Sequence, residues 1–175
     1  MALNFIAKLL LVLTFAAFSA GATRSQLKET KLTVFFHDFV AGPNTTVIPV
    51  AGIAGKLWTF TQFGTVYVTD DPLTATPDLN SAVVGRGQGL YVTSGLDGLN
   101  THVLISIVFT NKNYNGSTLE IQGTSKQFEA VREVSVVSGT GKFRFARGYA
   151  TFETLLVDAA TFYSVERCNV TVEHY

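Results

Sequence analysis

From residue 32 to residue 173 the sequence is a succession of apolar β-type segments separated by turn signals. No stretch of this region shows a helical period, and the connections are short, which favours an antiparallel barrel or a sandwich. Several segments, 101–110 among them, are apolar on both faces, and this favours a barrel whose outside is partly covered. The predicted strands are 32–38, 46–54, 63–69, 83–93, 101–110, 117–122, 133–137, 143–154 and 161–173.

Glycine occupies every second position in part of the segment 83–93, at Gly85, Gly87 and Gly89. One face of that strand is therefore bare, as tight barrel curvature or the close approach of a ligand or a neighbouring strand requires. Arg86 lies between these glycines, and a guanidinium in so apolar a strand needs a partner. We take Arg86 as a candidate substrate-binding residue, with surface or subunit pairing as the alternative.

The N-terminus has the pattern of a targeting segment. Lys8 supplies a positive charge, residues 9–17 are apolar, and Ala20, Gly21 and Ala22 fit a small-x-small cleavage site. We predict a signal peptide over 1–22, a disordered segment over 23–30, and one domain over 31–175. The run is too short for a membrane anchor, and no second run approaches that length, so we expect a secreted protein without a membrane partner.

Charge and glycosylation signals describe the expected surface. The chain has 13 basic and 13 acidic residues and no block of like charge, so nucleic acid is not an expected partner. Only 15% of residues are charged, which indicates that another subunit or carbohydrate covers part of the outside. Asn44, Asn115 and Asn169 each begin a glycosylation acceptor motif. Cys168 is the only cysteine, so no disulfide can form within the chain.

Asp38 is the first candidate catalytic residue. It ends an apolar strand on the same side as Val34 and Phe36. It is either a carboxylate that caps a loop, or an acid at a cavity mouth whose pKa apolar surroundings raise. Asp70 and Asp71 precede a proline, and we interpret them as turn residues that end the strand 63–69.

Arg132 is the second candidate, because a guanidinium at the start of the strand 133–137 can bind an electron-rich oxygen or stabilise an anion. Tyr91 and Tyr163 are aromatic residues suited to a cavity for a planar ligand. The three histidines lack metal-ligand spacing, and Gly139-Thr140-Gly141 precedes a β-type segment rather than a helix. We therefore expect neither a metal nor a cofactor.

Several motifs, taken together and in order, resemble the plant dirigent family over nearly all of 31–175. The resemblance implies an eight-stranded antiparallel up-and-down β-barrel of the allene-oxide-cyclase-like type, assembled as a homo-oligomer (trimer or dimer) in the apoplast. The motifs are His37-Asp38, Gly42-Pro43-Asn44 with Thr46, Phe63-Gly64, Asp70-Asp71-Pro72-Leu73-Thr74, Gly85-Arg86-Gly87-Gln88-Gly89, Tyr114-Asn115-Gly116-Ser117 and the run from Arg132 to Ala150.

The family resemblance also implies a function. A laccase or peroxidase makes phenoxy radicals from a monolignol such as coniferyl alcohol, and the dirigent protein directs their coupling to one enantiomer. The alternative is a lyase or cyclase that acts on a quinone methide or an isoflavanol, as in pterocarpan formation. A third possibility is a non-catalytic wall protein or carbohydrate-binding protein.

The motif match also places residues in the expected site. It carries over Asp38 and Arg132 as catalytic cavity residues and Tyr163, or Phe162 if the register differs by one, as a substrate-binding aromatic. Two departures favour a non-lignan-type subgroup. Gly123-Thr124-Ser125 stands where lignan-forming members have an acid, and Cys168 has no N-terminal partner.

Overall fold

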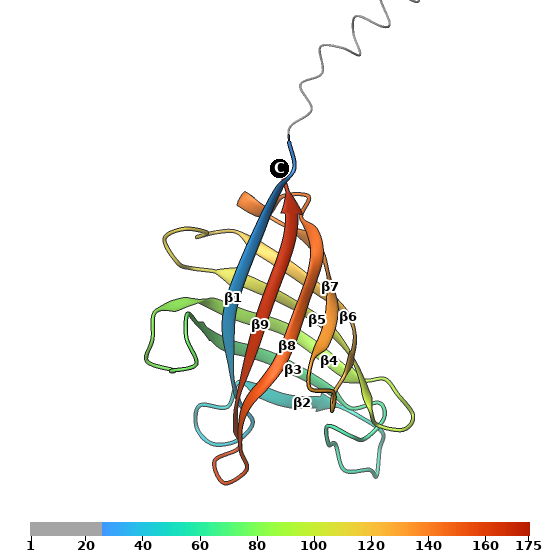
Figure 1. Ribbon diagram of the computed structural model, residues 1–175. Helices are drawn as coiled ribbons and strands as arrows, with labels where there is room; N and C mark the ends of the chain where they lie inside the picture. Colours follow the sequence, from blue (N-terminus) through green and yellow to red (C-terminus); the bar gives the residue numbers. More distant parts are fainter. Residues whose placement is uncertain (1–25) are drawn as a thin grey trace, which may run out of the picture.

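The computed structural model describes residues 26–175, so the predicted signal peptide lies outside the described residues. Nine strands follow one another and form a single sheet (Figure 1). A short 3₁₀ turn, η1 (Gly141–Phe143), separates the seventh strand from the eighth. Within the described range, no helix has the length and apolar character needed to cross a bilayer. The strands are β1 (Lys28–Phe39), β2 (Val47–Ala51), β3 (Val66–Thr74), β4 (Val83–Thr93), β5 (Asn100–Phe109), β6 (Thr118–Lys126), β7 (Arg132–Gly139), β8 (Arg147–Asp158) and β9 (Tyr163–His174).

The sheet closes on itself. Its order is β1-β9-β8-β7-β6-β5-β4-β3-β2, and β1 also pairs with β3 through Phe35↔Thr74 and Phe36↔Leu73. Eight strands therefore form a closed antiparallel ring, and β2 extends β3 beyond this seam (Figure 1). The predicted eight-stranded antiparallel barrel is confirmed. Closure pairs the ring strands on both sides, which leaves few free edges.

The predicted starts of the first strand and of the eighth strand need correction. β1 begins at Lys28, which pairs with His174 of β9, so the prediction of disorder over 23–30 is wrong for residues 28–30. The last strand supplies their partner, and local composition gives no sign of it. The segment 143–146 is not strand either, because η1 turns Phe143 inward, where it is fully buried.

One half of the barrel interior is filled by side chains. Near the end where β1 begins and β9 finishes, the rings of Phe109, Tyr114 and Phe143 pack with centroids 4.9–5.4 Å apart. Below them lies a layer of aliphatic residues, which strand alternation turns inward. This layer consists of Leu73, Ile107, Leu119, Ile121, Val136, Val170 and Val172.

The glycines of β4 allow close packing on the inner face. A Cβ at Gly87 would lie 2.2 Å from Cε1 of Phe36, so the ring from β1 occupies the space above this strand. At Gly85 and Gly89 a Cβ would lie about 2 Å from backbone oxygens of β5. The bare face of β4 therefore permits both the close approach of β5 and the inward placement of Phe36.

Candidate functional site

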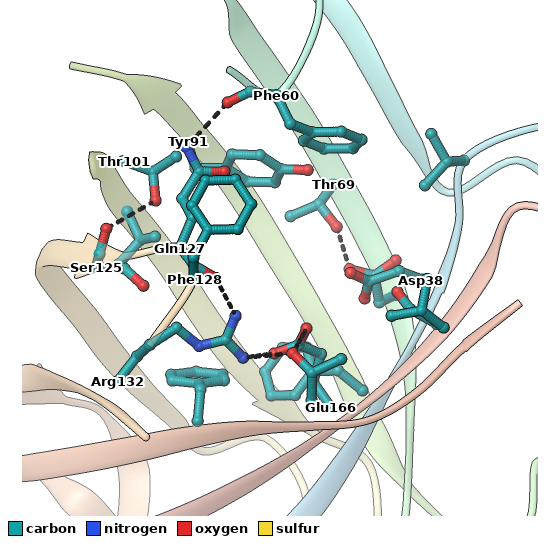
Figure 2. Close-up of a pocket in the computed structure, with 18 of the residues that line it drawn as sticks. Asp38, Phe60, Thr69, Tyr91, Thr101, Ser125, Gln127, Phe128, Arg132 and Glu166 are labelled. Carbon is teal, nitrogen blue, oxygen red and sulfur yellow. Dashed lines mark hydrogen bonds and ion pairs between the residues drawn. The ribbon is translucent and has the colours of Figure 1, made fainter. Parts of the chain in front are cut away.

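The other half of the barrel holds a cavity of about 650 Å³, within the usual range for small-molecule sites. It lies at the end where β1 and β8 finish and β9 begins, which is the lower end in Figure 1. Loop residues Phe60, Phe128 and Phe162 contribute to its mouth. The wall is largely apolar, and it carries two clusters of ionisable groups (Figure 2).

The first polar cluster is a pair of carboxyl groups, Asp38 of β1 and Asp71 of β3. They lie within hydrogen-bond reach of each other. Asp71 also accepts hydrogen bonds from the hydroxyl groups of Thr46 and Thr69. Both aspartates line the cavity, so the fraction of Asp38 that is exposed faces the cavity.

The surroundings of these two groups favour a bound proton. Burial raises the pKa of Asp38 well above its usual value, and the negative charges of Asp71 and Glu166 add to the effect. Burial also raises the pKa of Asp71 to about 6, although the hydrogen bonds from the two threonines oppose this shift. We assign the shared proton to Asp38, because Asp71 already accepts two hydrogen bonds that stabilise its ionised form.

The second polar cluster is an ion pair between Arg132 of β7 and Glu166 of β9. Nη2 of Arg132 also donates to the Thr154 hydroxyl at 3.0 Å, and that hydroxyl donates to Oε1 of Glu166 at 2.9 Å. Only 10% of the Arg132 side chain is exposed. The pairing fixes the guanidinium inside the cavity, where it can bind an electron-rich oxygen of a ligand.

A stack of aromatic rings forms another part of the wall. The ring of Phe60 is parallel to that of Tyr67 at 4.5 Å, and Tyr67 is 5.1 Å from Tyr91. Burial raises the pKa of the Tyr91 hydroxyl well above its usual value, and the carboxylate of Asp38 adds to this. Tyr91 is therefore a neutral phenol on the cavity wall (Figure 2), where we predicted a substrate-binding aromatic residue.

The two alternative aromatic residues near the start of β9 both lie at the cavity. Phe162 has a positive φ of 54°, which is unusual for a bulky residue. The Tyr163 hydroxyl is 2.6 Å from Nδ1 of His37, whose Nε2 is 2.7 Å from the Thr74 hydroxyl. His37 thus faces away from Asp38 and supports the start of β9 from behind.

The expectation that Arg86 lines the cavity is wrong. Strand alternation turns Gly85 and Gly87 inward, so Arg86 and Gln88 lie on the outer face. There Nε of Arg86 donates to the Asp70 carboxylate at 2.7 Å, and Gln88 donates to the same oxygen at 3.1 Å. The apolar strand holds a charge because Asp70, diagonally across from Arg86 on β3, supplies its partner.

Sequence reasoning missed two site residues, Asp71 and Glu166. The strand β3 continues through Pro72 to Thr74, so Asp71 is not a turn residue. Proline is tolerated because pairing of β3 with β2 ends at Thr69 and pairing with β1 begins at Leu73. Continuing the alternation from Tyr67 through Thr69 past the proline would have placed Asp71 inside.

The three acceptor asparagines lie in different settings. Asn44 and Asn115 are exposed in loops, whereas Asn169 lies on the outside of β9 and accepts a hydrogen bond from the Thr33 hydroxyl at 2.8 Å. Their modification stays a prediction. Across residues 26–175, no three potential metal-binding side chains cluster together.

Comparison with known proteins gives concordant matches. The family described as Dirigent-like protein matches residues 29–173. Pterocarpan synthase 1 of Glycine max is 39% identical over 147 residues, which cover 83% of this chain and 79% of the relative. Dirigent protein 1 of Arabidopsis thaliana is 36% identical over 163 residues, with 90% of each chain covered.

The fold also matches a solved structure. The structure of a pterocarpan synthase dirigent protein superposes with a TM-score of 0.78 at 37% identity. The match covers 87% of this chain and 88% of the other. The sequence matches and the structural match therefore point to one and the same protein family.

Proposed function

The chain belongs to the plant dirigent family, and on that premise we propose that it acts on a single phenolic molecule as a lyase or cyclase that works through a quinone methide. The observation that carries the proposal is the Asp38–Asp71 pair inside an apolar cavity. A carboxylic acid that keeps its proton near neutral pH is a general acid suited to protonating a leaving oxygen.

The proposed chemistry is the loss of water from a benzylic alcohol that has a phenol group in conjugation with it. Asp38 donates its proton to the benzylic hydroxyl, the carbon–oxygen bond breaks, and water leaves. The phenol loses its proton to solvent as the quinone methide forms, Asp38 takes a proton back from solvent, and Arg132 binds the oxygen on which negative charge accumulates. A second phenol of the same molecule then attacks the benzylic carbon and gives up its proton, which restores the first phenol.

The rest of the cavity favours one acid centre. Glu166 is already paired with Arg132, so the Asp38–Asp71 pair supplies the proton. The facing wall on β5 and β6 adds no further acid, because its polar residues Thr101 and Ser125 carry hydroxyl groups. Similarity to proteins named pterocarpan synthase supports the same class of reaction.

The second candidate is stereochemical control of phenoxy-radical coupling between monolignols. The cavity of about 650 Å³ supports it, because that volume accommodates two phenylpropanoid rings. The radicals would come from a laccase or peroxidase, and orientation in the cavity would select the product.

Two incubations separate the candidates. Purified protein is incubated with isoflavanols and no oxidase, and separately with coniferyl alcohol and a laccase or peroxidase. Cyclised product without oxidase supports the lyase or cyclase. An enantiomeric excess in the coupled lignan together with unchanged isoflavanol would replace it with the radical-coupling function, and racemic lignan with unchanged isoflavanol would contradict both.

The chain offers a matched pair of variants for this assay. Asp71→Asn removes a carboxylate inside the cavity, and Asp70→Asn removes the neighbouring one on the outer face. We expect Asp71→Asn to lower turnover by about 100-fold or more, and Asp70→Asn to keep it. Equal activity of both variants would remove the acid pair from the mechanism.

We further propose that the protein is exported to the apoplast and forms a homo-oligomer. Support for the oligomer comes from the outside of β2, β3 and β5, where Ile48, Val68 and Leu104 are each more than 40% exposed. Light scattering of the purified protein tests the oligomer, and a monomeric mass would contradict it.

A further inference from the structure

Three loops meet at the cavity mouth. They are the connections 52–65, 94–99 and 127–131, which join β2 to β3, β4 to β5 and β6 to β7. The first two touch closely, since a Cβ at Gly98 would lie 2.1 Å from the backbone oxygen of Thr61. Among the described residues these loops have no strand pairing with one another, so individual hydrogen bonds from backbone and side-chain groups hold them together.

The side chain of Gln127 joins all three loops. Its Nε2 donates to the Phe60 carbonyl at 2.9 Å and to the Gly98 carbonyl at 3.1 Å (Figure 2 shows the first bond). A primary amide has two N–H donors, and both are used here. The Gln127 backbone N–H donates to the Leu99 carbonyl at 3.0 Å. The Gln127 carbonyl also accepts from Nη1 of Arg132 at 3.4 Å.

We propose that Gln127 is the positioning residue of the cavity mouth. Its amide fixes Phe60, whose ring stacks on Tyr67 and lines the cavity. The Phe60 carbonyl also accepts from the Thr93 hydroxyl at 2.9 Å, so two donors from different elements fix this residue. Loss of the amide leaves the Gly98 carbonyl without this donor and loosens the loop 52–65, while the Gln127 backbone N–H still binds the Leu99 carbonyl.

The substitutions are chosen to separate hydrogen bonding from packing. Gln127→Leu keeps similar bulk and removes both donors. Gln127→Glu places a carboxylate against two carbonyl oxygens and regains a donor only when it is protonated. Gln122→Leu is the matched control, because Gln122 lies on the outer face of β6, the strand that precedes the loop of Gln127, and is exposed.

Trp58 reports on the first loop directly, because it is the only tryptophan of the chain and lies in 52–65. We expect acrylamide to quench Trp58 fluorescence about twofold more strongly in Gln127→Leu than in the native protein, while Gln122→Leu stays at the native value. In Gln127→Glu, quenching falls back toward the native value as the pH is lowered from 7 to 4, while the native protein shows no such trend.

This readout needs no substrate, so it stands even if the proposed function fails. Quenching equal to the native value in both Gln127 variants would overturn the proposal, as would a pH-independent increase in Gln127→Glu. In the turnover assay, which rests on the proposed function, Gln127→Leu raises KM several-fold and leaves kcat near the native value. A fall in kcat alone would contradict the positioning role.

Discussion

Asp38 and Asp71 come from two strands that meet only at the seam of the barrel, and burial in an apolar cavity raises the pKa of both carboxyl groups. Such an arrangement has a cost, because the folded state must desolvate two acids. It is also the arrangement that keeps an acid protonated, as the proposed loss of a benzylic hydroxyl requires. Catalytic usefulness and stability therefore oppose each other at these residues.

The Asp38→Asn variant tests this opposition. The folded-state pKa of Asp38 is raised, so its carboxyl favours folding most below the unfolded-state pKa, and this contribution is lost as the pH rises through the folded-state value. We expect Asp38→Asn to be more stable than the native protein at pH 7.5, with a free energy of unfolding about 1–2 kcal/mol higher.

Urea denaturation at several pH values measures the Asp38→Asn effect. The advantage of the variant should shrink between pH 7.5 and pH 4, and turnover should be lost at every pH. A variant that is less stable than the native protein at pH 7.5 would contradict the assignment of a raised pKa.

The ion pair of Arg132 and Glu166 has a role in stability and a proposed role in activity, and the two can be tested separately. Arg132→Met leaves the Glu166 carboxylate without its cation, and we expect this to lower the free energy of unfolding by about 3 kcal/mol. The double variant Arg132→Met with Glu166→Gln should recover most of that stability and remain inactive. Urea denaturation and the turnover assay together measure this, and an active double variant would show that the guanidinium is structural.

At the scale of elements, β3 and β4 divide the polar residues between the inside and the outside. Asp71 faces inward and Asp70 outward because they are consecutive residues of one strand. The same alternation in β4 turns Arg86 to the surface and the glycines to the interior. The strands thus decide which of two adjacent carboxylates can reach the cavity.

The Gly87→Ala variant tests how closely β4 and β1 are packed. The added Cβ would overlap the ring of Phe36, so we expect the free energy of unfolding to fall by about 2 kcal/mol. Adding Phe36→Leu should restore part of the loss, since the shorter side chain leaves room for the methyl group. Thermal unfolding of both single variants and the double variant measures this coupling, and simple additivity would exclude a direct contact.

At the scale of the whole molecule, the barrel is packed at one end and hollow at the other. The packed end holds the aromatic cluster and the aliphatic layer, and the hollow end holds the acid pair and the ion pair. Cys168 lies inside between them, fully buried, and burial raises the pKa of its thiol. The thiol can react only when the barrel opens.

Thiol modification therefore measures opening of the whole barrel. We expect a thiol reagent to label Cys168 at the rate of global unfolding, and a reductant to leave the melting temperature unchanged, because one cysteine cannot form an internal disulfide. Labelling should accelerate in urea in parallel with loss of the β-sheet signal. Rapid labelling without denaturant would show that the barrel opens locally at β9.

The sequence by itself determined the antiparallel strands, which follow from alternation and turn signals that are local. Its resemblance to the dirigent family, which rests on motifs spread over 31–175, added the barrel and the cavity residues Asp38, Tyr91, Arg132, Phe162 and Tyr163. Asp71 was missed because the local signal of Pro72 indicates the end of a strand. The proline is harmless only where the neighbours of β3 change from β2 to β1.

Only the tertiary structure decided which polar residues meet. Glu166 reaches Arg132 because β8 brings β7 and β9 together, and Arg86 finds Asp70 on the outer face because β3 and β4 pair in one register. Gln127 contacts residues 67 and 29 positions earlier in the chain. Such partners depend on barrel closure and strand register, which fix distances between residues that the sequence keeps far apart.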